Sequence, residues 1–181
     1  GRARRARPTP AAPGVSRPPA MGSYHYVVTA HPPTNVTHAV VGSFLGPDEV
    51  NLIVAKCTRL EVHRPSQAGL QPVYTVPLYG RIATLELWRP PGERTDLILI
   101  TTERYQFAVL AYDGTKGEVV TRASGELGDA IGRPAEGGQI AIVDPSARMV
   151  ALRLYDGLLK IIPVAGALAG SARGGAAGGG D

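Results

Sequence analysis

Short hydrophobic segments alternate with turn residues along most of the chain, and this pattern predicts β-strands. The segments are rich in Val, Ile, Leu, Thr and Tyr and are bounded by Gly, Pro, Asp or Asn. In "YGRIATLELWR" the side chains alternate between two faces with a period of two, as on a strand. One face carries Ile82, Thr84, Glu86 and Trp88, and the other carries Ala83, Leu85 and Leu87. The pattern predicts no helix. The expected strands are 24–30, 36–44, 50–56, 59–64, 70–76, 79–89, 97–102, 105–113, 117–123, 139–144, 148–156 and 157–163.

These strands belong to a longer repeat. A buried-looking strand followed by a short turn and a second strand starts at Asn51, Leu97 and Met149, at intervals of 46 and 52 residues. A four-stranded unit of about 40 to 50 residues is typical of a propeller blade. We therefore predict one blade over 50–89, a second over 97–144 and a third that begins at 148. The strands before residue 45 would belong to a neighbouring blade.

The predicted fold is all-β: an incomplete β-propeller of about two and a half four-stranded blades over residues 21–163, with disordered termini. A propeller closes with about four to eight blades. We therefore expect the chain to be the N-terminal piece of a larger protein. The Asp156-Gly157 pair between the last two strands predicts a two-residue turn with positive φ at both positions.

The two ends of the chain differ from this pattern in composition. Residues 1–20 hold five Arg, five Pro and no acid, and residues 164–181 contain thirteen Gly or Ala. Neither composition buries enough apolar surface to offset the entropy of ordering. We predict a disordered basic leader over 1–20 and a disordered Gly/Ala-rich tail over 164–181.

The ends also account for the basic charge of the chain. Its net charge is +4, but five of the 19 Lys and Arg lie in the first twenty residues and one is Arg173, whereas one of the 15 acids is Asp181. The remaining 13 basic and 14 acidic residues make the predicted blades almost neutral. Nucleic-acid binding would therefore depend on the leader. No apolar run reaches the ~18 residues of a membrane span, so no membrane contact is expected.

Candidate chemistry is sparse. His25, His31, His38 and His63 lack metal-ligand spacing, and Cys57 alone cannot build a zinc site or an intrachain disulfide. No phosphate-binding glycine motif is present. Acids occur singly at strand ends, where Asp beside Gly or Pro is turn chemistry; they are Asp96, Asp113, Asp144 and Asp156. We predict no enzyme, no cofactor, no metal, no catalytic residue and no small-molecule substrate.

One segment is a candidate surface for binding. Residues 124–138 form a long Gly-rich loop, and long loops in compact domains are often binding elements. Arg133 lies within it, and arginine is enriched at the centres of protein interfaces. Arg133 is the predicted partner-binding residue, with a solvated connection as the alternative.

Several unusual strings in the chain resemble one known family. "SYHYVVTAHPPT", "NLIVAKCTRLEV", "YGRIATLELWRPPGE", "IGRPAEGGQIAIVDP" and "RMVALRLYDGLLKIIP" are similar, in the same order, to the start of the large subunit of the UV-damaged-DNA-binding protein. The resemblance covers residues 23–163. Neither the leader nor the tail shares it.

The resemblance implies a fold and a function. Members of this family carry three seven-bladed propellers and a helical domain, and this chain would supply the opening blades of the first propeller. They are adaptors of cullin 4 RING ubiquitin ligases that hold substrate receptors, meet damaged DNA indirectly, and act in repair and ubiquitination in the nucleus and also the cytoplasm. The alternative is a related propeller subunit of a splicing or polyadenylation complex that binds protein and nucleic acid.

Overall fold

The computed structural model describes residues 26, 28, 30–129 and 132–164, and every regular element in this part of the chain is a β-strand. The chain divides into two units, Gly1–Pro32 and Pro33–Asp181, and all the strands lie in the second. They are β1 His38–Gly42, β2 Asn51–Lys56, β3 Arg59–Ser66, β4 Gly69–Pro77, β5 Ile82–Trp88, β6 Leu97–Thr102, β7 Gln106–Asp113, β8 Glu118–Glu126, β9 Ile140–Val143, β10 Met149–Tyr155 and β11 Leu158–Pro163.

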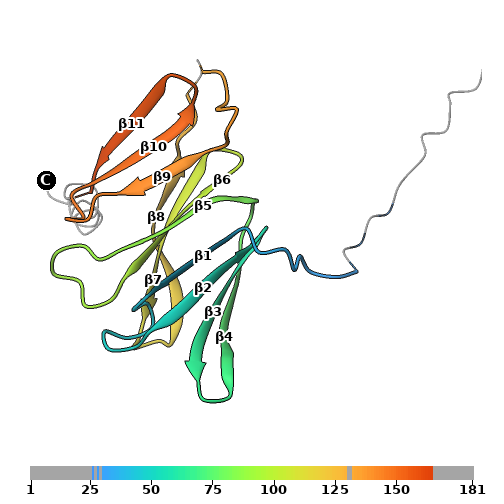
Figure 1. The fold of residues 1–181 in the computed structure, drawn as a ribbon, viewed down its shortest axis with the longest axis vertical. Helices are drawn as coiled ribbons and strands as arrows, with labels where there is room; N and C mark the ends of the chain where they lie inside the picture. The colour runs from blue at the N-terminus through green and yellow to red at the C-terminus, as the bar shows by residue number, and fades with distance from the viewer. Residues whose placement is uncertain (1–25, 27, 29, 130–131, 165–181) are drawn as a thin grey trace, which may run out of the picture. The chain divides into compact units, whose positions relative to one another are not determined.

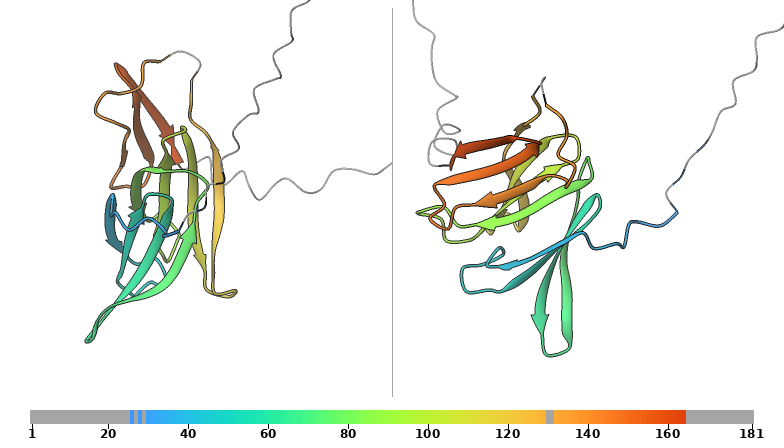
Figure 2. Two further views of the ribbon diagram at one scale, coloured as in Figure 1. Left: turned by 90° about the vertical axis from the view of Figure 1, so that its right-hand side faces the viewer. Right: turned by 45° about the horizontal axis from the view of Figure 1, so that its top comes forward.

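The strands form three antiparallel sheets in chain order. β1 to β4 make the first sheet, β5 to β8 the second, and β9 to β11 the third (Figure 1). Each strand pairs with its neighbour in sequence, so every sheet is a meander. The sheets follow one another as separate layers (Figure 2). This arrangement confirms the predicted all-β, incomplete propeller.

The predicted blade boundaries are wrong by one strand. The segment 36–44, assigned above to a neighbouring blade, contains β1 and pairs with β2 in the first sheet. The segment 79–89, assigned to the end of the first blade, contains β5 and opens the second sheet. The error has a physical cause: the most buried strand marks the repeat in sequence, and that strand is the second of each sheet. The repeat length was therefore correct and its phase was not.

β6 lies at the centre of the core because both of its faces are covered. All six of its residues are buried. Leu97 and Leu99 belong to the hydrophobic cluster shared with the third sheet, whereas Ile98 and Ile100 belong to the cluster shared with the first. A strand buried on both faces reads as a continuous apolar run, which is how "LILITT" appears in the sequence.

Single side chains also join neighbouring sheets. Asp96, just before β6, accepts a hydrogen bond from the amide of Ser43 at 2.6 Å and another from Arg89 Nε at 2.9 Å. A Cβ at Gly42 would lie 2.5 Å from the same carboxylate. A larger residue at position 42 would therefore displace the side chain of Asp96.

The tightest charge cluster lies on the first sheet. Glu61 of β3 accepts a hydrogen bond from Lys56 Nζ at 2.6 Å, forms an ion pair with Arg59 at 2.9 Å and lies 3.2 Å from His63 Nε2. The hydrogen bond from Lys56 and the charges of Lys56 and Arg59 hold the pKa of Glu61 below its ordinary value. These three side chains stabilise the ionised carboxylate of Glu61 on the sheet face opposite the core.

Several local predictions can now be compared with the structure. Most of the expected strand 24–30 lies outside the described residues, and so do most of the leader and the tail. Only Gly157 of the Asp156-Gly157 turn has positive φ, at 74°, so the prediction for Asp156 is wrong. A β-bulge shifts the register of β10 and β11 beside this turn. Because of this shift, the hairpin closes with only one residue in the left-handed region.

Candidate functional site: the loop face

One margin of the three sheets carries the connections of interest. In a meander, alternate connections fall on the same margin of the sheet. The connections at 57–58, 78–81, 103–105, 127–139 and 156–157 therefore share one side, which we call the loop face. Arg133, the predicted binding residue, lies in the longest of them.

Backbone hydrogen bonds link the loop-face connections into one arc. Within the arc, each connection bonds to the next in space, at 2.6 to 3.2 Å. The bonds are Leu78 N to Thr58 O, Ile82 N to Cys57 O, Glu103 N to Arg81 O, Leu127 N to Tyr105 O, Ala135 N to Leu154 O and Asp156 N to Arg133 O. The loop face is thus held by the three sheets together and not by any single hairpin.

Tyr155 anchors the longest connection. Its ring is 4% exposed and stacks on Tyr105 with centroids 5.1 Å apart. Its hydroxyl accepts a hydrogen bond from the amide of Asp129 at 3.0 Å, and a Cβ at Gly132 would collide with the ring at 2.5 Å. Tyr155 therefore contacts Asp129 and Gly132 ahead of Arg133, and its backbone forms a bridge with Pro134 directly after it.

Arg133 projects from this anchored segment. Its side chain is 71% exposed and pairs with Glu136, while its Nε lies 4.0 Å from Asp156 Oδ2. The carbonyl of Arg133 accepts the bond from the amide of Asp156 at 3.0 Å. Surface ion pairs are weak, so a partner carboxylate could replace these contacts. Partner binding through Arg133 remains a prediction.

Two hollows are lined in part by residues at or beside the β6–β7 turn. The axial hollow, of about 430 Å³, lies where the first strands of the sheets begin. Its lining mixes polar and apolar side chains. Two hydrogen bonds fix Gln139 at its wall: the side chain accepts from Thr101 Oγ1 at 2.9 Å and donates to the carbonyl of Thr102 at 2.8 Å. It is lined by Thr37, His38, Ile82, Ala83, Glu103, Tyr105, Ala135, Gly137, Gly138, Gln139 and Leu154.

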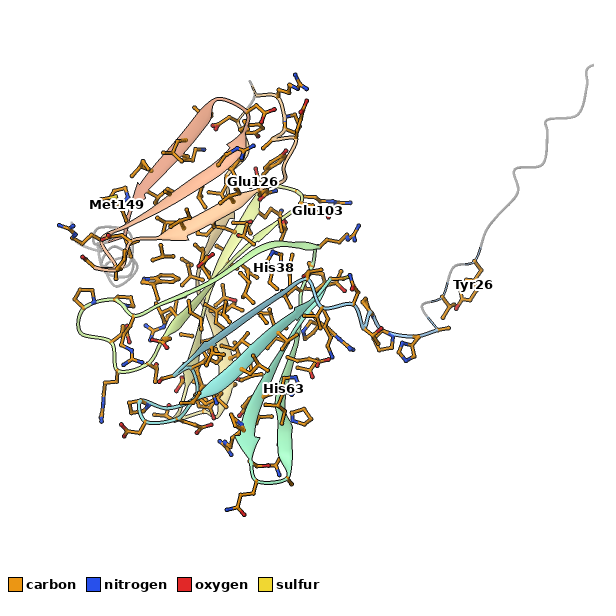
Figure 3. All side chains as sticks on the ribbon, viewed as in Figure 1. Tyr26, His38, His63, Glu103, Glu126 and Met149 are labelled. Atoms are coloured by element: carbon orange, nitrogen blue, oxygen red, sulfur yellow. The ribbon has the colours of Figure 1, made fainter. Side chains whose placement is uncertain are left out.

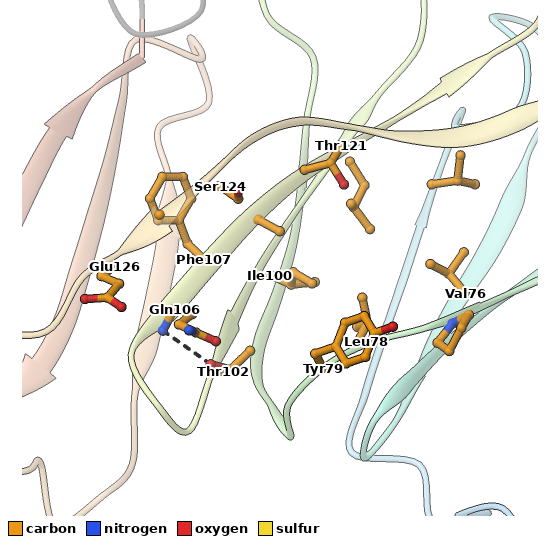
Figure 4. A pocket seen from close by; sticks show the side chains of 15 residues that line it. Val76, Leu78, Tyr79, Ile100, Thr102, Gln106, Phe107, Thr121, Ser124 and Glu126 are labelled. Carbon is orange, nitrogen blue, oxygen red and sulfur yellow. Dashed lines mark hydrogen bonds between the residues drawn. The ribbon is translucent and has the colours of Figure 1, made fainter.

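The second hollow is a groove between the first and second sheets, which we call the inter-sheet groove. It measures about 480 Å³ and is mostly apolar. Figure 4 shows side chains of the second sheet along one part of it, and Val76, Leu78 and Tyr79 at the other end. Nearby, the Tyr74 hydroxyl lies 3.1 Å from that of Tyr112 and donates to the carbonyl of Gly117 at 2.7 Å.

Among the described residues, the remaining candidates from the sequence do not come together, and His25 lies outside those residues. His38 and His63 lie on different strands of the first sheet (Figure 3), and His31 bonds only its neighbour's carbonyl. Cys57 occupies the β2–β3 turn with φ of 55°. Among the described residues, no group of three His, Cys, Asp or Glu side chains is placed to hold a metal, and no helix is long and apolar enough to cross a membrane.

The single acids at strand ends act mainly in their own turns. Asp113 accepts from the amide and hydroxyl of Thr115, and these bonds lower the pKa of Asp113. Asp144 accepts from Arg148, and Asp156 from Arg153. Asp96 differs, because it joins the first two sheets as described above. The inter-sheet groove had no sequence signal, since its walls come from segments up to 50 residues apart.

Comparison with known proteins supports the resemblance seen in the sequence. Residues 35–175 match the sequence profile of the RSE1/DDB1/CPSF1 first β-propeller. This match includes twelve residues of the predicted tail, which lie outside the described structure apart from Val164. The groove, the axial hollow and Arg133 all lie within the matched region.

Three similar relatives come from plants. DNA damage-binding protein 1 of Solanum lycopersicum is 60% identical to this chain over 143 residues. The rice protein of that name and DNA damage-binding protein 1a of Arabidopsis thaliana are each 59% identical over the same length. These alignments cover 79% of this chain and 13% of each relative, so the chain spans a small part of their length. The profile match and these identities show that the chain belongs to the DNA damage-binding protein 1 family, as a part of its first β-propeller.

Proposed function

We propose that this chain forms blades of the first propeller of a non-enzymatic adaptor subunit in a cullin 4 RING ubiquitin ligase. The adaptor binds substrate-receptor proteins and so acts in DNA-damage recognition, repair and protein ubiquitination. It meets damaged DNA through those receptors and works in the nucleus, and also in the cytoplasm.

The observation that carries this proposal is the identity of 55 to 60% with five plant DNA damage-binding proteins. The loop face gives it physical support. Its arc presents hydrogen-bonded backbone and exposed side chains such as Arg133, and a surface ordered before binding meets partners with a smaller entropic cost. The near balance of charge over the blades favours protein partners above direct phosphate contact.

The test uses the full-length gene product. Tagged protein is purified from cells before and after ultraviolet irradiation, and the associated proteins are identified. We expect cullin 4 and receptor subunits in both samples, with nuclear staining of the tagged protein. Purification without either class of subunit would contradict the proposal, and splicing or polyadenylation factors in their place would support the alternative.

A further inference from the structure

We propose that the inter-sheet groove binds a short extended peptide segment that carries aliphatic side chains and, at one end, a Lys or Arg. The inference rests on the proposed protein-binding function and adds the chemistry of the segment that binds. It follows from the apolar floor of the groove, its single charge and its exposed aromatic side chain.

The floor of the groove is aliphatic on both sides. Val76 and Leu78 come from the first sheet and the connection that follows it, and Ile100 and Leu110 come from the second sheet. A volume of about 480 Å³ falls within the range of about 300 to 1,000 Å³ typical of ligand sites. One wall is a face of the second sheet, along β7 and β8, and the other is the end of β4 with the connection that follows it. Such a space suits the side chains of an extended segment better than a folded domain.

The polar side chains of the groove determine which charge on a bound segment it favours. Of the fifteen lining residues, Glu126 is the only acid, and none is Lys, Arg or His. It forms no ion pair with any described residue. The other polar side chains are neutral, among them Thr102, Gln106 and Thr121. A basic side chain is therefore the complement of this groove, whereas an acidic one would be repelled.

The position of the charge gives the bound segment a direction. Figure 4 places Glu126 at one end of the groove and Val76 at the other, with Thr102 and Ile100 between them. The basic residue of the segment should therefore lie at one end and its aliphatic residues along the rest. Tyr79 stands beside the aliphatic end with its side chain fully exposed. An aromatic ring so placed can cover an aliphatic side chain and lose little rotamer entropy.

The test selects peptides on the 181-residue chain with a random nonapeptide display library. Two variants block the groove by different means. Thr121→Trp fills it from an exposed position on β8, and Glu126→Lys reverses its charge. Glu118→Lys is the matched control, because Glu118 is exposed on the same strand but does not line the groove. Circular dichroism and thermal unfolding establish that each variant is folded.

We expect the selected peptides to combine aliphatic residues with a terminal Lys or Arg. Thr121→Trp should abolish their binding, and Glu126→Lys should weaken it at least about tenfold, which is the effect of about 1.4 kcal/mol. Glu118→Lys should leave the affinity unchanged. Peptides that bind both groove variants as well as the wild type, or that lack the basic residue, would overturn the proposal.

The two proposals can fail separately. The same variants are introduced into the full-length gene product, and its cullin 4 and receptor subunits are measured by co-purification. Peptide binding that does not depend on the groove removes this inference, whatever co-purifies. Loss of ligase subunits from the wild-type protein removes the proposed function, even where peptides still select the groove.

Discussion

Glu86 is an acidic side chain on the half-covered face of β5. Burial raises the pKa of its carboxyl above the ordinary value of 4.5, and it forms no ion pair with any described residue. A group whose folded-state pKa is raised favours the folded state when it is protonated. Its contribution is present below the unfolded pKa and is lost as the pH rises through the folded pKa. At neutral pH this carboxylate therefore lowers the stability of the fold.

Glu86→Gln should raise the free energy of unfolding at pH 7 because the amide keeps the shape without the charge. The gain should shrink toward pH 4, where the wild-type side chain is itself protonated. Urea unfolding at pH 4, 5, 6 and 7 measures this. Glu118→Gln, at an exposed position of β8, is the control. Equal stability of wild type and Glu86→Gln at every pH would contradict the prediction.

A buried polar chain joins the second sheet to the start of the third. The hydroxyls of Thr84 and Thr101 lie 2.8 Å apart, and Thr101 Oγ1 donates to Gln139 at 2.9 Å. Thr101 is fully buried. Replacing either Thr101 or Gln139 leaves a polar group of the other without its hydrogen bond, whereas replacing both removes the two groups that form this bond.

Thr101→Val and Gln139→Leu should each cost about 1 to 2 kcal/mol of unfolding free energy. The double variant should cost clearly less than the sum, because the two residues are in contact. Chemical denaturation of all four proteins gives the coupling energy. Strict additivity would show that the network does not act as a unit.

At the scale of elements, turn geometry decides how the hairpins close. Gly157 has φ of 74°, and a Cβ there would meet nothing within 4 Å. Any cost of substitution therefore comes from the backbone and not from a clash. Cys57 occupies a similar left-handed position in the β2–β3 turn although it is not a glycine.

Gly157→Val should lower the free energy of unfolding by about 1 to 2 kcal/mol, because a β-branched residue is strained in the left-handed region. Gly114→Val is the matched control. Gly114 also has open space for a Cβ, but its φ is not in that region. Thermal unfolding compares the two, and similar losses would argue against backbone strain as the cause.

The elements were largely predictable from sequence, and their grouping was not. Period-two alternation and turn residues located nearly every strand within the described range, with boundaries wrong by a few residues at β5 and β8. The grouping failed because burial marks the second strand of each sheet. The candidate site was even harder to predict from the sequence. Arg133 was placed in its loop, but the groove and the anchoring role of Tyr155 depend on contacts between segments far apart in sequence.

At the scale of the whole molecule, β6 separates two cores. Leu99 lies in the cluster that includes Trp88, which faces the third sheet, whereas Ile100 lies in the cluster that faces the first. Trp88 is the only tryptophan of the chain and is 7% exposed. Its fluorescence therefore reports on one core and not on the other.

Leu99→Ala and Ile100→Ala should each cost about 2 to 5 kcal/mol of stability. Their effects on the native emission should differ. Leu99→Ala should change the emission of Trp88 under native conditions because it opens a cavity in the same cluster, whereas Ile100→Ala should leave it unchanged. Steady-state fluorescence below the unfolding transition makes the comparison. Equal changes in both variants would mean that the two cores are not separate.

The hydrogen-bonded arc of the loop face also determines where the chain tolerates added sequence. The connection at 57–58 bonds to Ile82 of the second sheet, and the connection at 127–139 bonds to Leu154 of the third, so a lengthened loop at either place disturbs two sheets at once. At the opposite margin, the β3–β4 turn is closed within itself by Ser66 Oγ, which donates to Gly69 O. The β7–β8 turn is closed by Asp113 and Thr115 but is also tied to the first sheet, because Tyr74 donates to the carbonyl of Gly117. An epitope tag or fluorescent label is therefore best inserted at 67–68, where it leaves the loop face and its hydrogen bonds intact.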